Sequence, residues 1–97
     1  MNNDDLIPVE KLCVNYNIEF SFLDSLNAIG LVEFVTVEEI NFIEKENLSE
    51  LERMIRLHSD LGINIEGIEA IIHLLRRVDA LQHEIAALKN KFGETPE

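Results

Sequence analysis

The sequence is short of several residue types, and each shortage excludes a class of protein. Its 97 residues contain one cysteine, Cys13, so no internal disulfide can form and the composition suits a reducing compartment. Its four glycines form none of the G-x-G-x-x-G, G-x-x-x-x-G-K or G-x-S-x-G motifs that cradle phosphates or present a nucleophilic serine. Apolar runs fall short of the roughly 18 residues that cross a bilayer. Disulfide-rich, nucleotide-binding, hydrolytic and membrane-spanning proteins are therefore not indicated.

Metal-binding and catalytic groups are equally sparse. The three histidines have no partner at zinc-ligand spacing, and Cys13 belongs to no Cys-x-x-Cys pair. The adjacent acids Glu38 and Glu39 make a poor acid–base pair, because neighbouring side chains of a strand point to opposite faces. We predict no enzymatic activity, no metal and no cofactor. The start, Met1-Asn2-Asn3-Asp4-Asp5, differs from a secretory leader, so we predict a soluble, cytoplasmic protein.

Basic side chains are also scarce, with eight Lys and Arg against 19 Asp and Glu, which gives a formal net charge of −11. Residues 1–50 hold eleven acids and two bases, a net charge of −9, whereas residues 51–97 carry a net charge of −2. Nucleic-acid binding begins with cations that neutralise phosphates, and anionic membranes attract basic segments. Both partners are therefore disfavoured, and a basic protein is favoured. The alternative is an acidic surface that only maintains solubility.

Helical periodicity predicts two short helices, over residues 8–16 and 19–29, joined by a turn at Asn17. Pro8 suits the first turn of the first helix, and Gly30 suits the end of the second. Such a pair is typical of a helix-turn-helix. The residues predicted to be buried form one apolar stripe on each helix: Val9, Leu12, Cys13 and Tyr16 on the first, and Phe22, Leu23, Leu26 and Ile29 on the second.

The next segments change character. Residues 31–37 and 40–43 are rich in Val, Ile and Phe and are too short for helices. They predict a small β-hairpin, or wing, after the helix pair. No Asn-Gly or Asp-Gly pair marks the turn, so its position stays open.

Two further helices are predicted after the wing. The first covers residues 48–61 and is opened by a capping box of Asn47 and Glu50. Asn64 can cap the second, which extends from Ile65 to Phe92 without a proline. The apolar stripe of the first helix comprises Leu48, Leu51, Met54, Ile55, His58 and Leu61.

The last helix carries an a/d heptad pattern, in which apolar residues recur every seven positions. This heptad seam comprises Ile71, Leu74, Val78, Leu81, Ile85, Leu88 and Phe92. A second apolar stripe, of Ile68, Ile72 and Leu75, exists only near the start of the helix. The start is therefore predicted to pack on its own domain and the remainder on a second copy, in a parallel or antiparallel homodimer. The alternative is a helix folded back on its own domain.

The order of these elements resembles a MerR-like winged helix-turn-helix with a long C-terminal dimerisation helix. The step Ile29-Gly30-Leu31-Val32 and the junction Leu61-Gly62-Ile63-Asn64-Ile65-Glu66-Gly67-Ile68 carry the resemblance. Asp24 stands where MerR regulators carry an arginine, and the wing carries acids where they carry an arginine-rich strand. The elements expected to contact DNA have thus lost their positive charge.

The resemblance predicts a mainly α fold in four segments. Residues 1–5 and 93–97 are expected to be disordered ends. Residues 6–63 are expected to form the winged helix-turn-helix domain, with its small β-hairpin wing. Residues 64–92 are expected to form the long helix that carries the heptads.

Within that superfamily the chain resembles the CbpM-type chaperone modulators, which are acidic and lack an effector domain. The matching segments are Leu12-Cys13, Ile18, Gly30-Leu31-Val32-Glu33 and Arg56-Leu57-His58. The resemblance implies binding to the J-domain of a DnaJ-like co-chaperone, whose basic helix an acidic face would cover. The residues it implicates are Phe20 as an apolar anchor, with Glu19, Asp24, Glu33, Glu38 and Glu39 around it.

Three alternatives stay open at this point. Phe20 can turn inward and belong to the core. The chain can act as a MerR-type DNA-binding transcription regulator. It can also be a subunit that only pairs two copies of another protein, an alternative that shares the dimer prediction and makes no claim about the acidic face.

Overall fold

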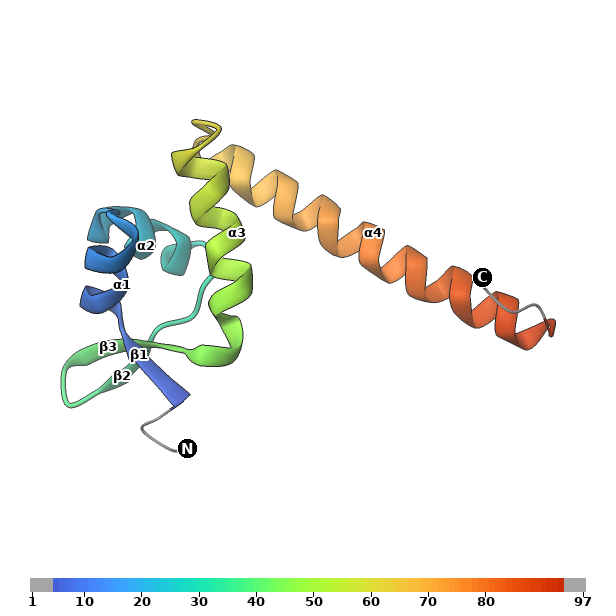
Figure 1. Cartoon of the computed structure of the whole chain (residues 1–97), viewed down its shortest axis with the longest axis horizontal. Helices are drawn as coiled ribbons and strands as arrows, with labels where there is room; N and C mark the ends of the chain where they lie inside the picture. Colours follow the sequence, from blue (N-terminus) through green and yellow to red (C-terminus); the bar gives the residue numbers. More distant parts are fainter. Residues whose placement is uncertain (1–4, 94–97) are drawn as a thin grey trace.

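Figure 1 shows a small body of three helices and a sheet, from which one long helix extends. The computed structural model describes residues 5–93. The predicted disordered ends lie outside these residues, except for Asp5 and Gly93. The predicted mainly helical fold with a small antiparallel sheet is confirmed. In chain order the elements are β1 (Leu6–Pro8), α1 (Val9–Tyr16), α2 (Phe20–Ala28), β2 (Val35–Val37), β3 (Ile40–Glu44), the 3-10 turn η2 (Lys45–Asn47), α3 (Leu48–Ser59) and α4 (Ile65–Lys91).

The two predicted short helices are present, with corrections at their ends. Pro8 is the last residue of β1 instead of a helical residue, with φ −60° and ψ 135°. Asn17 ends α1 in the left-handed conformation, at φ 53°. Ile29 is 39% exposed instead of buried, because α2 ends at Ala28 and the helical periodicity that predicted its burial ends there too. Gly30 follows with φ 83°, as expected of a glycine after a helix.

The sheet has three antiparallel strands in the order β1-β3-β2. The hairpin of β2 and β3 was predicted, whereas β1 was not, because three residues are too few to establish an alternating pattern. The predicted strand over residues 31–37 is wrong in its first half. The backbone N–H groups of Leu31 and Val32 both donate to the carbonyl of Leu26, at 3.0 and 3.3 Å, so these residues fold back on α2.

The hairpin turn consists of Glu38 and Glu39, between Val37 and its partner Ile40. Both glutamates have positive φ, 51° and 67°, as a type I′ turn requires of its two central residues. Asn and Gly normally occupy these positions, because the left-handed conformation costs other residues roughly 1–2 kcal/mol each. The turn therefore lies in the gap between the two predicted strand segments, whereas the prediction that these acids are neighbours within a strand is wrong. The turn is strained because neither residue is Asn or Gly.

α3 begins directly after η2, and the predicted capping box at its start is wrong. The side chain of Asn47 makes no capping hydrogen bond, and Glu50 binds Arg76 of α4 instead. Leu61 is 69% exposed because α3 ends at Ser59. The exposed ring of His58 stacks on buried Phe22, with 4.3 Å between ring centroids.

α4 is capped as predicted, since the Oδ1 of Asn64 accepts a hydrogen bond from the N–H of Gly67 at 2.8 Å. Ile68 and Ile72 of its first turns are buried against the body, as their short stripe predicted. Leu75, the third member of that stripe, is 38% exposed, so its predicted packing is wrong. From there α4 extends away from the body (Figure 1), so it does not fold back on its own domain. The buried core comprises Val9, Leu12, Phe22, Leu23, Leu26, Val32, Ile43, Leu51, Met54, Ile55, Ile68 and Ile72.

Candidate functional site

Two of the grooves formed by the described residues have volumes of about 560 and 590 Å³. The more apolar of these two lies between the first two helices and the wing. We define the wing as residues 35–44 and call this hollow the wing groove; its volume is about 590 Å³. The lining comes from β1, α1, α2, the wing turn and β3. Its members are Pro8, Val9, Glu10, Cys13, Val14, Phe20, Glu39, Ile40 and Asn41.

Three large apolar side chains of the wing groove face solvent. Val14 of α1 is 79% exposed, Phe20 of α2 is 47% exposed, and Ile40 of β3 is 54% exposed. The ring of Phe20 rests beside that of Phe34, with 6.2 Å between centroids and 41° between planes. Phe20 is thus half exposed and lines the groove, although it also touches an aromatic neighbour. Apolar side chains gathered in one hollow are typical of a binding site, whereas scattered ones are not.

Two acidic side chains border this apolar floor, and two more belong to α2 or to the residue before it. Glu10 and Glu39 line the groove itself. Asp24 is exposed and lies one helical turn after Phe20, on the same side of α2. Glu19 directly precedes α2, and its carboxylate accepts a hydrogen bond from the Ser21 hydroxyl at 3.3 Å. The groove therefore offers an apolar centre with carboxylates around it, an arrangement that fits a ligand with an apolar centre and basic flanks.

One acid that the resemblance implicated belongs elsewhere. Glu33 lies near Glu44, at the end of β3 that is remote from the wing turn, and its charge helps to raise the pKa of Glu44. A hydrogen bond with the carboxyl of Glu46 is the main cause of that raised pKa, followed by lost hydration and the charges of Glu46, Glu33 and Asp5. The fold therefore brings Phe20 and Glu39 into one groove and places Glu33 in a separate acidic group.

Cys13 lies in the wall of the wing groove and is half-buried. Burial raises the pKa of its thiol, and the nearby charge of Glu10 raises it further. A raised pKa keeps the sulfur protonated at neutral pH, so Cys13 is a poor nucleophile there. Its position suits a packing role.

Val14, Ile40 and Glu10 line the groove and were not predicted from the sequence. Val14 carries the clearest signal, because it stands outside the stripe of Val9, Leu12 and Cys13 and so had to point outward. Ile40 and Glu10 had no such signal, since they join the groove only when β3 and α1 pack together.

The heptad seam forms a second exposed apolar surface, along α4. Ile71 at its start is half-buried. The side chains beyond it face solvent: Leu74 is 58% exposed, Val78 is 48%, Leu81, Ile85 and Leu88 are each 52%, and Phe92 is 74%.

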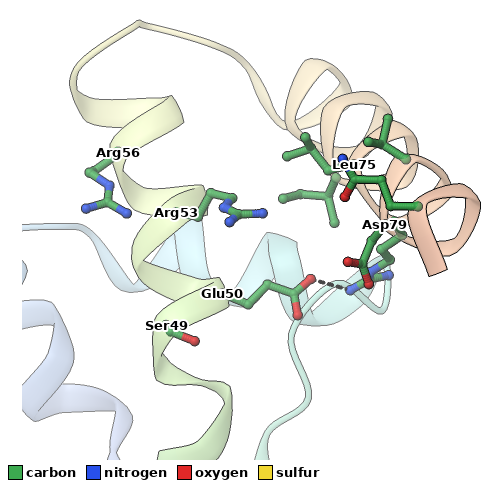
Figure 2. A pocket seen from close by; sticks show the side chains of 10 residues that line it. Ser49, Glu50, Arg53, Arg56, Leu75 and Asp79 are labelled. Carbon is green, nitrogen blue, oxygen red and sulfur yellow. Dashed lines mark hydrogen bonds and ion pairs between the residues drawn. The ribbon is translucent and has the colours of Figure 1, made fainter. Parts of the chain in front are cut away.

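The other groove, of about 560 Å³, separates α3 from the start of α4. Figure 2 shows Arg53 extending from α3 toward Leu75, and Glu50 reaching across to α4. Glu50 binds the guanidinium of Arg76 at 2.7 Å, an exposed ion pair that contributes at most about 1 kcal/mol. Because Asp79 also lines this groove, its charges are mixed and favour no ligand of one sign.

Two features are absent from residues 5–93. No helix in this part of the chain combines the length and hydropathy that a membrane crossing requires. The same residues contain no group of three or more His, Cys, Asp or Glu side chains arranged to hold a metal ion.

Comparison with known proteins gives one match. A family model described as MerR HTH family regulatory protein matches residues 7–90, which span the helix pair, the wing, α3 and nearly all of α4. Searches of curated proteins and of solved structures found no match.

Proposed function

The chain belongs to the MerR HTH family of regulatory proteins, and from that premise we propose that it acts by binding a basic protein. In this proposal it is a non-enzymatic chaperone modulator of the CbpM type. It binds the J-domain of a DnaJ-like co-chaperone and covers the basic helix with which the J-domain engages its ATPase chaperone. The bound J-domain then cannot reach that chaperone, so the modulator inhibits by competition.

One observation carries the proposal, namely the charge of the surface that DNA-binding relatives use. Asp24 is exposed on α2, at the position where the resemblance to MerR regulators implies an arginine, and the wing turn displays Glu38 and Glu39. Carboxylates repel phosphates, whereas they attract Lys and Arg and accelerate the encounter with a basic surface. The net charge of −9 over residues 1–50 adds a long-range attraction of the same sign.

The proposed modulator is a homodimer. The heptad seam is exposed for several turns of α4, and a second copy supplies an identical seam to cover it.

Purified J-domains of DnaJ-like co-chaperones from the same genome provide the test, by calorimetry at 50 and 300 mM salt. We expect at least one to bind, with an affinity that falls as salt rises. Asp24→Arg should weaken binding at least tenfold, because it places a cation against a basic helix. Asp60→Arg is the matched control, since it makes the same charge change at the exposed end of α3 and should alter affinity less than threefold.

Two results would count against this function. Absence of binding to every J-domain at low salt would remove it, and equal affinities for wild type and Asp24→Arg would remove the proposed contact surface. The second candidate is a DNA-binding transcription regulator, which the family match favours. An electrophoretic shift assay on genomic fragments at low salt tests it, and sequence-specific binding would support it against the charge argument.

A further inference from the structure

We propose that the wing groove receives the apolar ridge of one amphipathic, basic helix, with Val14, Phe20 and Ile40 contacting the ridge. The acids around the groove then contact the basic flanks of that helix. This inference rests on the proposed function in assigning the helix to a J-domain. It goes further by naming the wing groove as the binding site of the helix and three apolar residues as its contacts.

The apolar side chains of the groove are exposed and lie together. Val14, Phe20 and Ile40 come from three different elements and still meet in one hollow. Their exposed fractions, 79%, 47% and 54%, leave most of the Val14 and Ile40 surface without intramolecular contact. Apolar groups at the centre of an interface carry most of the affinity, while the rim contributes specificity. A ligand that binds by charge alone would leave this surface exposed.

The wing turn places a carboxylate in the groove wall. Glu39 lines the groove from a left-handed conformation, at φ 67°. Asn and Gly would form this turn with less strain. Strain that the fold tolerates at a ligand-facing position is an indication of function. The turn holds a carboxylate beside Ile40, where it can pair with a cation on the flank of a bound helix.

The edge of the sheet at the groove suits a helical ligand better than an added strand. β1 pairs with β3 only from Phe42 to Glu44. On the β1 side of β3, Ile40 and Asn41 therefore have no strand beside them, and both residues line the groove. Two residues are too few for an added strand, which needs about three or more. A helix satisfies its own backbone hydrogen bonds and presents side chains at i, i+4 and i+7, which suits a hollow walled by side chains.

The test uses helix-stabilised peptides as probes, so that it does not depend on any J-domain. One 18-residue peptide carries three leucines at i, i+4 and i+7 between lysines and arginines. The second replaces the leucines with alanine, and the third replaces the basic residues with glutamate. Fluorescence anisotropy at 100 mM salt should show binding of the leucine peptide, at least tenfold weaker binding of the alanine peptide, and no binding of the glutamate peptide.

Variants of the protein locate the contact. Val14→Ser and Ile40→Ser should each weaken the leucine peptide at least fivefold. Val37→Ser is the matched control, because Val37 is 43% exposed on the same wing but outside the groove lining, and it should change affinity less than twofold. All these positions are exposed, so circular dichroism should confirm retained folding. Bound leucine peptide should also slow alkylation of Cys13, the only thiol of the chain, at least threefold.

The outcomes separate this inference from the proposed function. Equal affinity for the leucine and alanine peptides, or no effect of Val14→Ser and Ile40→Ser, would show that the helix does not bind in the wing groove through these apolar residues. If a J-domain binds and both serine variants bind it normally, the function stands and this inference fails. If the leucine peptide binds in the groove while no J-domain does, the inference stands for another basic helix and the proposed function fails.

Discussion

The wing groove and the heptad seam both expose large apolar side chains, but in different patterns. The seam repeats every seven residues along one helix, and each of its members from Leu74 onward is about half exposed or more. The groove takes its apolar residues from three elements and surrounds them with acids. A regular repeat is complementary to another copy of itself. An irregular hollow with charge of one sign fits the oppositely charged partner of the proposed function.

The two surfaces lie in different halves of the chain, and we expect one half to bind the partner and the other to form the dimer. The half with a net charge of −9 holds the groove, and the half with a net charge of −2 holds the seam. A strongly acidic seam would repel its own copy, so the near balance of charge on α4 suits self-association. If the tasks are separate, damage to one surface should leave the other intact.

The largest expected effect comes from Leu81→Glu at the centre of the seam. Each buried leucine contributes about 1.5–3 kcal/mol, and a dimer buries two copies of it. The dimer dissociation constant should therefore rise at least about a hundredfold, as measured by sedimentation equilibrium.

Ala80→Glu is the control for that variant, because it adds the same charge at the neighbouring position outside the seam. It should leave the dimer intact. The Leu81→Glu monomer should still bind the leucine peptide within threefold of the wild type. A dimer that persists, or a groove that loses its affinity in the monomer, would contradict the separation of tasks.

An intermediate effect is expected at the wing turn, where stability and binding should change in opposite directions. Replacing both glutamates, Glu38→Asn with Glu39→Gly, relieves the positive-φ strain and should raise the free energy of unfolding by about 1–2 kcal/mol. Urea denaturation measures that gain. Because Glu39 lines the groove, the same double variant should bind the leucine peptide several-fold more weakly.

Glu38→Asn alone separates the two consequences, since Glu38 is not among the groove-lining residues. It should gain part of the stability and keep the affinity. A double variant that is no more stable than the wild type would mean that the turn is not strained. Unchanged peptide affinity would remove Glu39 from the site.

The smallest effect tests whether the acids remote from the groove act differently from those beside it. The carboxyl of Glu46 raises the pKa of Glu44 above the ordinary 4.5, so the folded chain binds that proton more tightly than the unfolded chain. The stability it contributes is therefore present below about pH 4.5 and is lost as pH rises through the raised pKa.

Glu46→Gln should consequently stabilise the protein relative to the wild type more at pH 7 than at pH 4, by urea denaturation. Glu84→Gln, on α4 and far along the chain, should show no such difference between the two pH values. Peptide affinity should be unchanged in both variants. An equal shift at pH 4 and pH 7 for Glu46→Gln would mean that the carboxyl pair is not coupled.

Periodicity in the sequence predicted the helices and most of the core, because burial of Leu12, Leu23 or Ile68 follows from local spacing. The residue type at position 64 predicted the cap, because Asn often caps a helix that begins directly after it. The failures lie where tertiary contacts override local pattern. β1 exists because β3 pairs with it, and Glu50 leaves the predicted capping box to bind Arg76.

The candidate site was predictable only in part, for a similar reason. Phe20, Asp24 and the acidic wing could be selected from charge and from the family resemblance. The groove could not, because its walls come from elements that are distant in sequence, and the wing turn lacks the glycine that would have located it. Whether these residues bind a J-domain stays a prediction.

Pro8 gives the wing groove one further property. It is the last residue of β1, and Val9 begins α1 directly after it, so no linker separates strand from helix. The ring of proline fixes φ near −65°, and Pro8 itself has φ −60°. The fixed φ removes one free torsion from the junction of the sheet and α1, so it restricts the movement of one groove wall against the other. A receptor with fewer free torsions at its binding surface loses less conformational entropy when a ligand binds.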